Sequence, residues 1–234
     1  STAISGVFLP KVTAMVTKEN NEKAISDLFI RTGRIQYIII AFILTGFVVF
    51  GKSFIRLWAG SDYEDAYGIT LCFFIPMTVP LIQNLGIIIL QARNQMKFRS
   101  TLYVVIAFVS LVISIPLSKQ YGGIGCAISI ALALTTGQII VMNIYYHRVI
   151  HIDILDFWKE IGKMSLVPFA IGSLSFYLFC IYEIHTVQIF IVCIFAFSCI
   201  YVPLFWFFGM NAYEKELFVS PVRRFVGRLQ KNLQ

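Results

Sequence analysis

Six long apolar stretches, none with a single charged side chain, dominate this sequence and limit it to a membrane fold. Each has 16 to 24 residues, and a helix rising 1.5 Å per residue needs about 20 to cross a hydrocarbon core of about 30 Å. Strands are shorter than this, and helices on soluble proteins carry a charged face. The pattern therefore predicts an all-α, polytopic transmembrane bundle with six full spans. We expect these spans at Ile35–Phe50, Tyr67–Leu90, Thr101–Leu117, Ile124–Tyr146, Met164–Tyr182 and Thr186–Gly209.

Basic side chains gather in every second loop. Of the 19 Lys and Arg residues, 16 precede the first span, follow the second or the fourth, or lie in the tail, against 3 in the other loops. Because Lys and Arg accumulate in cytoplasmic loops, we expect the C-terminus on the cytoplasmic side. This topology accounts for the net charge of +7, and no basic stripe is interleaved with exposed aromatics. A nucleic-acid partner is therefore not expected.

Polar and apolar segments divide the chain into five parts. Because Pro10 and Lys11 follow what reads as the last turns of a helix leaving the membrane, we interpret the chain as the C-terminal part of a longer transporter. The expected parts are the end of a preceding transmembrane helix with a cytoplasmic connector (1–34), a four-helix transmembrane core (35–146), a cytoplasmic amphipathic helix (147–163), a peripheral, lipid-facing transmembrane hairpin (164–209) and a basic cytoplasmic tail (210–234).

The second span combines two prolines with two amides. Pro76 and Pro80 each remove a backbone donor and clash one turn back, which predicts a kink near Ile75–Pro80. Gln83 and Asn84 follow and form the densest polar spot in any span. Side-chain amides beside a broken helix are typical of a cavity wall, but they also occur as hydrogen bonds that only join helices. The sequence leaves both roles open.

Two apolar patterns and one small-residue pattern predict how other segments pack. The loop after the first span predicts a short interfacial helix around Leu57 and Trp58. Small residues every four positions in the fourth span predict a close helix contact through Gly123, Ala127, Ala131 and Thr135. The segment after this span predicts a surface helix whose apolar face consists of Ile150, Ile154, Leu155, Trp158 and Ile161.

The sequence offers little that an enzyme would use. His147 and His151 have a spacing found in metal sites, but only Asp153 or Asp156 is near to act as a third ligand and no HExxH context exists. There are no paired carboxylates at membrane depth, no nucleophile–base pair and no phosphate-binding glycine loop. The five cysteines all lie in spans, without a CxxC. We therefore expect neither enzymatic activity nor a metal or cofactor.

Cationic side chains flank the expected cytoplasmic ends of the first two spans. Arginine suits bidentate phosphate recognition and lysine acts as a point charge, although the same residues also fit a purely topological role. A strip of polar residues leads from Asn84 into Arg93, which makes that arginine the most informative of them. The candidate substrate-binding residues are Arg31, Arg34, Gln83, Asn84, Gln91, Arg93 and Lys97.

Four short motifs, taken in order, suggest a family. They are Phe8–Lys11 at a helix end, Ile55–Gly60 after the first span, Leu90–Lys97 after the second, and Tyr121–Ala127 at the start of the fourth. In this order and spacing they resemble the C-terminal half of bacterial polysaccharide flippases. These are the O-antigen and capsule exporters of the multidrug/oligosaccharidyl-lipid/polysaccharide superfamily. The resemblance covers about residues 1–146.

The resemblance implies one lobe of a two-lobed, V-shaped transporter of the bacterial inner membrane. Such proteins move a polyprenyl-pyrophosphate-linked oligosaccharide to the outer leaflet by alternating access, and basic residues of their central cavity meet the pyrophosphate. The implied partners are this lipid-linked oligosaccharide, membrane lipids, and the polysaccharide polymerase and chain-length proteins. Two other functions stay open. One is a cation-coupled multidrug exporter of the same superfamily, although no span holds an acid. The other is a non-transporting scaffold of a polysaccharide assembly complex.

Overall fold

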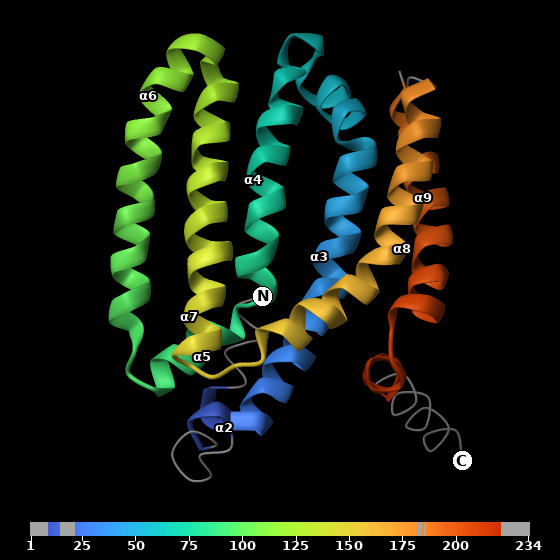
Figure 1. Ribbon diagram of the computed structural model, residues 1–234. Helices are drawn as coiled ribbons and strands as arrows, with labels where there is room; N and C mark the ends of the chain where they lie inside the picture. The colour runs from blue at the N-terminus through green and yellow to red at the C-terminus, as the bar shows by residue number, and fades with distance from the viewer. Residues whose placement is uncertain (1–8, 15–21, 182–183, 185, 221–234) are drawn as a thin grey trace, which may run out of the picture.

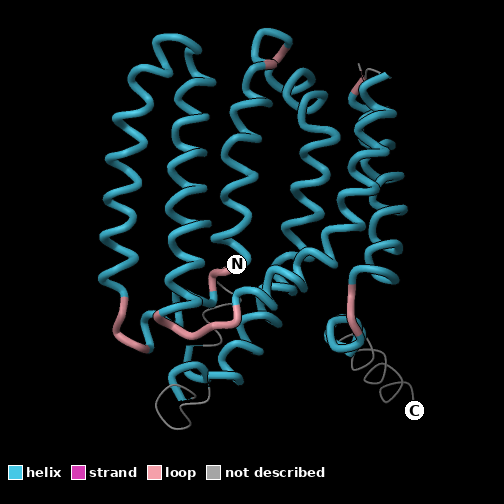
Figure 2. The backbone as a smooth tube through the Cα atoms, viewed as in Figure 1, coloured by secondary structure: helices cyan, strands magenta, loops and turns pink. Residues whose placement is uncertain are grey.

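The computed structural model describes residues 9–14, 22–181, 184 and 186–220, and within them every regular element is a helix (Figures 1 and 2). Five helical segments of this described part are long and apolar enough to cross a membrane. The expected all-helical, membrane-type fold is confirmed at this level. The five segments are Glu22–Ala59, Ser61–Ile82, Met96–Arg148, Ile154–Phe179 and Val187–Gly209.

Short connections join these helices into a bundle (Figure 1). A further helix occupies residues 212–220 after a two-residue break. In chain order the elements are α2 (Leu9–Ala14), α3 (Glu22–Ala59), the 3₁₀ turn η2 (Ser61–Tyr63), α4 (Asp65–Ile82), α5 (Leu85–Ala92), α6 (Met96–Leu134), the π-helical η3 (Thr135–Val141), α7 (Met142–Arg148), α8 (Ile154–Ile181), α9 (Val187–Leu204) and the π-helical η4 (Phe205–Gly209). α3 packs both on its neighbour in sequence, α4, and on the distant α8, which makes the most extensive contact.

The first expected span is the middle of a longer helix. α3 runs unbroken from the connector through the span and on to Ala59, so there is no boundary at residue 34 and no separate interfacial helix around Trp58. α3 contains no proline and ends only where Gly60 takes a positive φ of 102°. Glycine is the residue that adopts this conformation without steric cost. Trp58 remains 79% exposed at this end of α3, stacked on Phe54.

The second expected span is two helices. α4 continues through Pro76 and Pro80 and stops at Ile82, so the interruption falls after the prolines rather than between them. The chain turns at Gln83 and Asn84, where Gly86 N–H donates to the Gln83 carbonyl at 2.9 Å. α5 then packs against α2, and Figure 1 shows both at the same end of the bundle. The two amides therefore lie at a helix junction.

α6 is a hairpin of two antiparallel limbs that reverses at Gly122, whose φ of 61° and ψ of −138° are non-helical (Figure 1). Of the predicted small-residue stripe, Ala127 is buried with 1% of its surface exposed, whereas Gly123 is exposed. A second stripe, two positions further on, faces the first limb: Gly125, Ser129 and Ala133 in α6 and Gly137 in η3. Ser129 Oγ lies 3.3 Å from the carbonyl oxygen of Ser110 on that limb.

The expected surface helix and fifth span are one helix. α8 is continuous from Ile154 to Ile181, without a break at residue 163. Three members of the predicted apolar face, Ile150, Ile154 and Ile161, are buried, but Leu155 is 72% exposed and Phe157, which was not predicted, is fully buried. Ile154, Phe157 and Ile161 follow a three- and four-residue spacing and pack into a core with α3, α5 and α7. The predicted face therefore covers protein rather than the membrane surface.

The last hairpin is less peripheral than expected. One side of α9 packs on α3 and α8 through an aromatic core that includes Phe50, Phe197 and Tyr201. The other side stays exposed, as at Phe195 (70%). Of the short connection at 183–185, only Ile184 belongs to the described residues, and it is buried in the same core. The basic tail beyond residue 220 lies outside the described part, as does most of the segment before residue 22.

Candidate functional site

The α5–α6 turn, taken as residues 91–99, holds three of the candidate residues: Gln91 near the end of α5, Arg93 between the helices and Lys97 at the start of α6. α5 ends in a Schellman motif: Gln95 N–H donates to the Leu90 carbonyl at 2.8 Å and Asn94 N–H to the Gln91 carbonyl at 3.0 Å. Asn94 takes the left-handed φ of 55° that this motif requires. The motif fixes the direction in which Arg93 leaves α5.

Positive charge at this turn has no acidic partner in the described part of the chain. Arg93 Nη1 donates to the backbone carbonyl of Ile150 at 2.9 Å, and Lys97 is exposed. Arg99, one turn further, is only 8% exposed, and its guanidinium donates to the hydroxyls of Tyr103 at 2.8 Å and Tyr146 at 3.4 Å. None of the three cations forms an ion pair with a described carboxylate. Gln91 is exposed beside them.

The amides of the α4–α5 junction are buried, Gln83 with 3% and Asn84 with 7% of its surface exposed. Gln83 Nε2 donates to Asn143 Oδ1 at 2.8 Å, and Trp158 Nε1 donates to the same oxygen at 3.1 Å. Asn143 in turn donates to the Ile139 carbonyl on its own helix. One amide therefore joins the α4–α5 junction to α7 and α8. Gln83 therefore forms a hydrogen bond that joins two helices. Asn84 also interacts with other groups of the protein.

We expect Asn143→Leu to destabilise the protein by about 1–3 kcal/mol for each donor that it leaves buried without an acceptor. Both Gln83 and Trp158 lose their acceptor in this variant. Thermal unfolding in detergent measures the change. Gln91→Leu is the matched control because it removes an exposed amide, and its midpoint should stay within experimental error of the parent. Equal midpoints for the two variants would contradict a structural role for Asn143.

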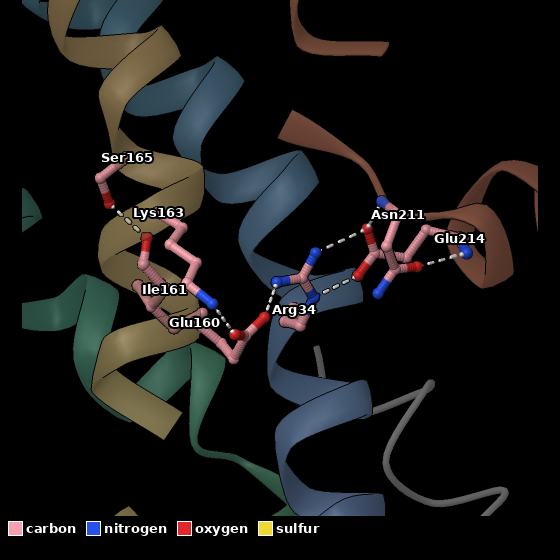
Figure 3. A network of polar contacts seen from close by, with 7 residues as sticks. All are labelled: Arg34, Glu160, Ile161, Lys163, Ser165, Asn211 and Glu214. Atoms are coloured by element: carbon pink, nitrogen blue, oxygen red, sulfur yellow. Dashed lines mark hydrogen bonds and ion pairs between the residues drawn. The ribbon is translucent and has the colours of Figure 1, made fainter. Parts of the chain in front are cut away.

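Arg34 lies in a buried ionic network rather than at an open mouth (Figure 3). Its Nε and Nη2 donate to the two carboxylate oxygens of Glu214, at 2.5 and 3.1 Å, and its Nη1 donates to Glu160 Oε2 at 2.6 Å. Arg34 is 6% exposed and Glu214 1%. Lys163 Nζ completes the network by donating to the other oxygen of Glu160 at 2.6 Å.

Glu214 also caps the helix at 212–220. Asn211 N–H donates to Glu214 Oε2 at 2.9 Å, and Glu214 N–H donates back to Asn211 Oδ1 at 3.0 Å, which is a capping box. On the same side, the Arg31 guanidinium lies 5.3 Å from the ring centre of Tyr213. Arg31 and Arg34 therefore both hold the segment that follows α9.

The sequence alone did not indicate Asn143, Glu160 or Glu214 as members of a polar network. Arg34 is 126 residues from Glu160 and 180 from Glu214, so no local spacing signals the pairing. The pattern Asn211-x-x-Glu214 was the available signal, because it is typical of a helix start. His147 and His151 are exposed, and the described residues contain no group of three or more metal-ligating side chains.

No protein-family model, no curated protein and no solved structure matches this chain.

Proposed function

We propose that this chain is part of a transporter that flips polyprenyl-pyrophosphate-linked oligosaccharide across the bacterial inner membrane for surface polysaccharide synthesis. The C-terminus faces the cytoplasm, and transport follows alternating access. The ordered motifs between Phe8 and Ala127 support this proposal, as does the all-helical fold with its long apolar segments.

The observation that carries the proposal is that some cations form ion pairs with carboxylates whereas those near the α5–α6 turn do not. Arg34 has two carboxylate partners, and Lys52 and Arg56 share Glu64. Arg93, Lys97 and Arg99 have no such partner among the described carboxylates. These unpaired positive charges at the α5–α6 turn provide a place where a pyrophosphate acts as the counter-ion. We therefore assign the initial contact with the phosphates to Arg93 and Lys97, with Gln91 beside them.

The other candidate residues take supporting roles in this proposal. Arg31 and Arg34 fix the cytoplasmic segment after α9, and Gln83 holds the α4–α5 junction against α7. In this proposal they hold neighbouring helices together rather than touch the substrate. Asn84, buried and engaged within the protein, stays a candidate for the wall of a sugar path, one of the two roles that the sequence leaves open.

A strain lacking the full-length gene tests the function. If the protein is a flippase, this strain should accumulate lipid-linked oligosaccharide on the inner leaflet, while its tolerance to cationic drugs stays normal. Drug hypersensitivity without accumulation would replace the proposal with cation-coupled efflux. Normal drug tolerance and normal lipid intermediates would instead support a scaffold of the assembly complex.

The double variant Arg93→Gln/Lys97→Gln should lower surface glycan at least tenfold, because a hydrogen bond to a charged group contributes about 1.5–3 kcal/mol. Glycan staining at matched membrane protein levels measures the effect. Lys119→Gln is the control, since Lys119 is exposed on the α6 turn at the opposite end of the bundle. Unchanged glycan in the double variant would remove both residues from the mechanism.

A further inference from the structure

The helix at 212–220 lies at the end of the last apolar segment. It follows Val187–Gly209 after only two residues, and Figure 1 shows it nearly end-on, in red below α9. It therefore runs across the direction of α9 rather than along it. A helix in this orientation at the end of a span lies along the membrane surface.

Two contacts hold this helix in place. The ring centre of Phe218 lies 6.4 Å from that of Trp206 in η4, and Glu214 joins the helix to α3 through Arg34. Ser220, the last described residue, is therefore held near the membrane surface. A segment that follows it meets lipid at a high effective concentration, because it is tethered there.

The negative charge of Glu214 is already neutralised within the protein. Both of its carboxylate oxygens accept from Arg34, and only 1% of its surface is exposed. Arg34 also pairs with Glu160, which pairs in turn with Lys163. Two carboxylates and two cations thus form one group whose charges sum to zero. This group does not oppose a cationic segment after the helix.

Positive charge dominates the sequence that follows. On the helix itself the exposed Glu216 comes directly after Lys215, so these two charges offset each other. Residues 221–234 lie outside the described part of the chain, and their sequence contains no acid and four cations: Arg223, Arg224, Arg228 and Lys231. Clusters of about four to eight Lys and Arg beside a span are typical of segments that bind anionic lipid.

The apolar residues of this basic tail have helical spacing. They recur at i, i+3, i+4, i+7 and i+11, as Val222, Phe225, Val226, Leu229 and Leu233. This spacing places them on one side of a helix, and the four cations fall on the opposite side. Large apolar residues on one side with Lys and Arg on the other are typical of segments that lie in the membrane interface.

We infer that residues 212–233 form a contact with the surface of an anionic membrane. The cations of the tail lie against lipid phosphates, and its apolar residues lie among the acyl chains. Positive charge by itself also suits an acidic protein, but the apolar side and the position at the end of a span favour lipid. This contact does not depend on the proposed function, because it needs only a membrane-spanning chain whose tail meets an anionic leaflet.

A nitroxide label on the full chain, with its five cysteines replaced by alanine, tests the inference in vesicles. Leu229→Cys places the label on the apolar side, and Gly227→Cys places it among the cations. Collisions with oxygen report lipid, and collisions with a water-soluble nickel complex report water. In vesicles of equal parts phosphatidylglycerol and phosphatidylcholine, the label at 229 should meet mainly oxygen and the label at 227 mainly nickel. In phosphatidylcholine alone, both should meet mainly nickel.

Charge variants of the Leu229→Cys chain test the choice of lipid. Arg224→Gln/Arg228→Gln should lower the ratio of inserted to free tail about thirtyfold in the phosphatidylglycerol vesicles, since each cation near an anionic surface contributes about 1 kcal/mol. Lys52→Gln/Lys119→Gln is the matched control. It removes two exposed lysines at the opposite end of the bundle and should leave the ratio unchanged.

Four results would overturn the inference. If the label at 229 meets mainly nickel in both kinds of vesicle, an acidic protein is the better partner for the tail. If it is equally shielded from nickel in both, the tail packs on the protein itself. If the labels at 227 and 229 do not differ, the tail has no apolar side in the membrane. If the two double variants have the same effect, the cations of the tail do not select the lipid.

Discussion

Replacement of Arg34 by alanine should lower the free energy of unfolding by about 3–5 kcal/mol, the usual loss when one partner of a buried ion pair is removed. The variant leaves Glu214 charged while only 1% of its surface is exposed, and it removes a partner of Glu160. It also removes the two hydrogen bonds that join Glu214 of the helix at 212–220 to α3, leaving the contact between Arg31 and Tyr213. Unfolding of the full chain in mixed micelles of dodecyl sulfate measures the loss.

Two further variants show that the loss comes from the unpaired charge. Arg34→Met/Glu214→Gln removes both charges but keeps an oxygen that can accept from Asn211, so much of the stability should return. Lys163→Ala breaks a pair in which the lysine is 62% exposed and should change stability by no more than about 1 kcal/mol. If Arg34→Ala and Lys163→Ala cost the same, the network does not stabilise the fold as described.

Among the glycines of the α6 hairpin, Gly125 should be the one whose replacement by alanine lowers stability most. A Cβ at this position would overlap the backbone oxygen of Leu117, and backbone cannot rotate away as a side chain does. Forced overpacking of this kind costs about 1–3 kcal/mol and sometimes more. The yield of monodisperse protein and the thermal midpoint in detergent should both fall.

Gly46→Ala is the matched control for the hairpin variant. Apart from the local backbone of α3 and the two chain neighbours, no atom lies within 4 Å of a Cβ built at Gly46, which is in the middle of this helix. Alanine there should raise stability by about 0.5–1 kcal/mol through its better helix propensity. A Gly125→Ala protein as stable as the parent would show that the limbs of α6 are farther apart than the structure places them.

The candidate site could be predicted from the sequence only in part. Its residue types and their place at the ends of apolar stretches follow from local pattern, and Arg93 and Lys97 are only four residues apart where α5 gives way to α6. The local sequence pattern does not reveal partners that lie far along the chain. The sequence analysis therefore placed Arg34 and Arg93 in the same site, although Arg34 pairs with two carboxylates and Arg93 donates to a backbone carbonyl.

The sequence by itself determined that this chain forms long apolar helices, because the length of an uncharged stretch and the helical rise are local quantities. Only the tertiary structure decided which side of each helix is buried: it added a stripe that begins at Gly125 beside the predicted Ala127, and it buried Phe157 instead of Leu155 on α8. The reason is geometric, since helices separated in sequence select by their packing which of several similar faces meet, and which charges become paired.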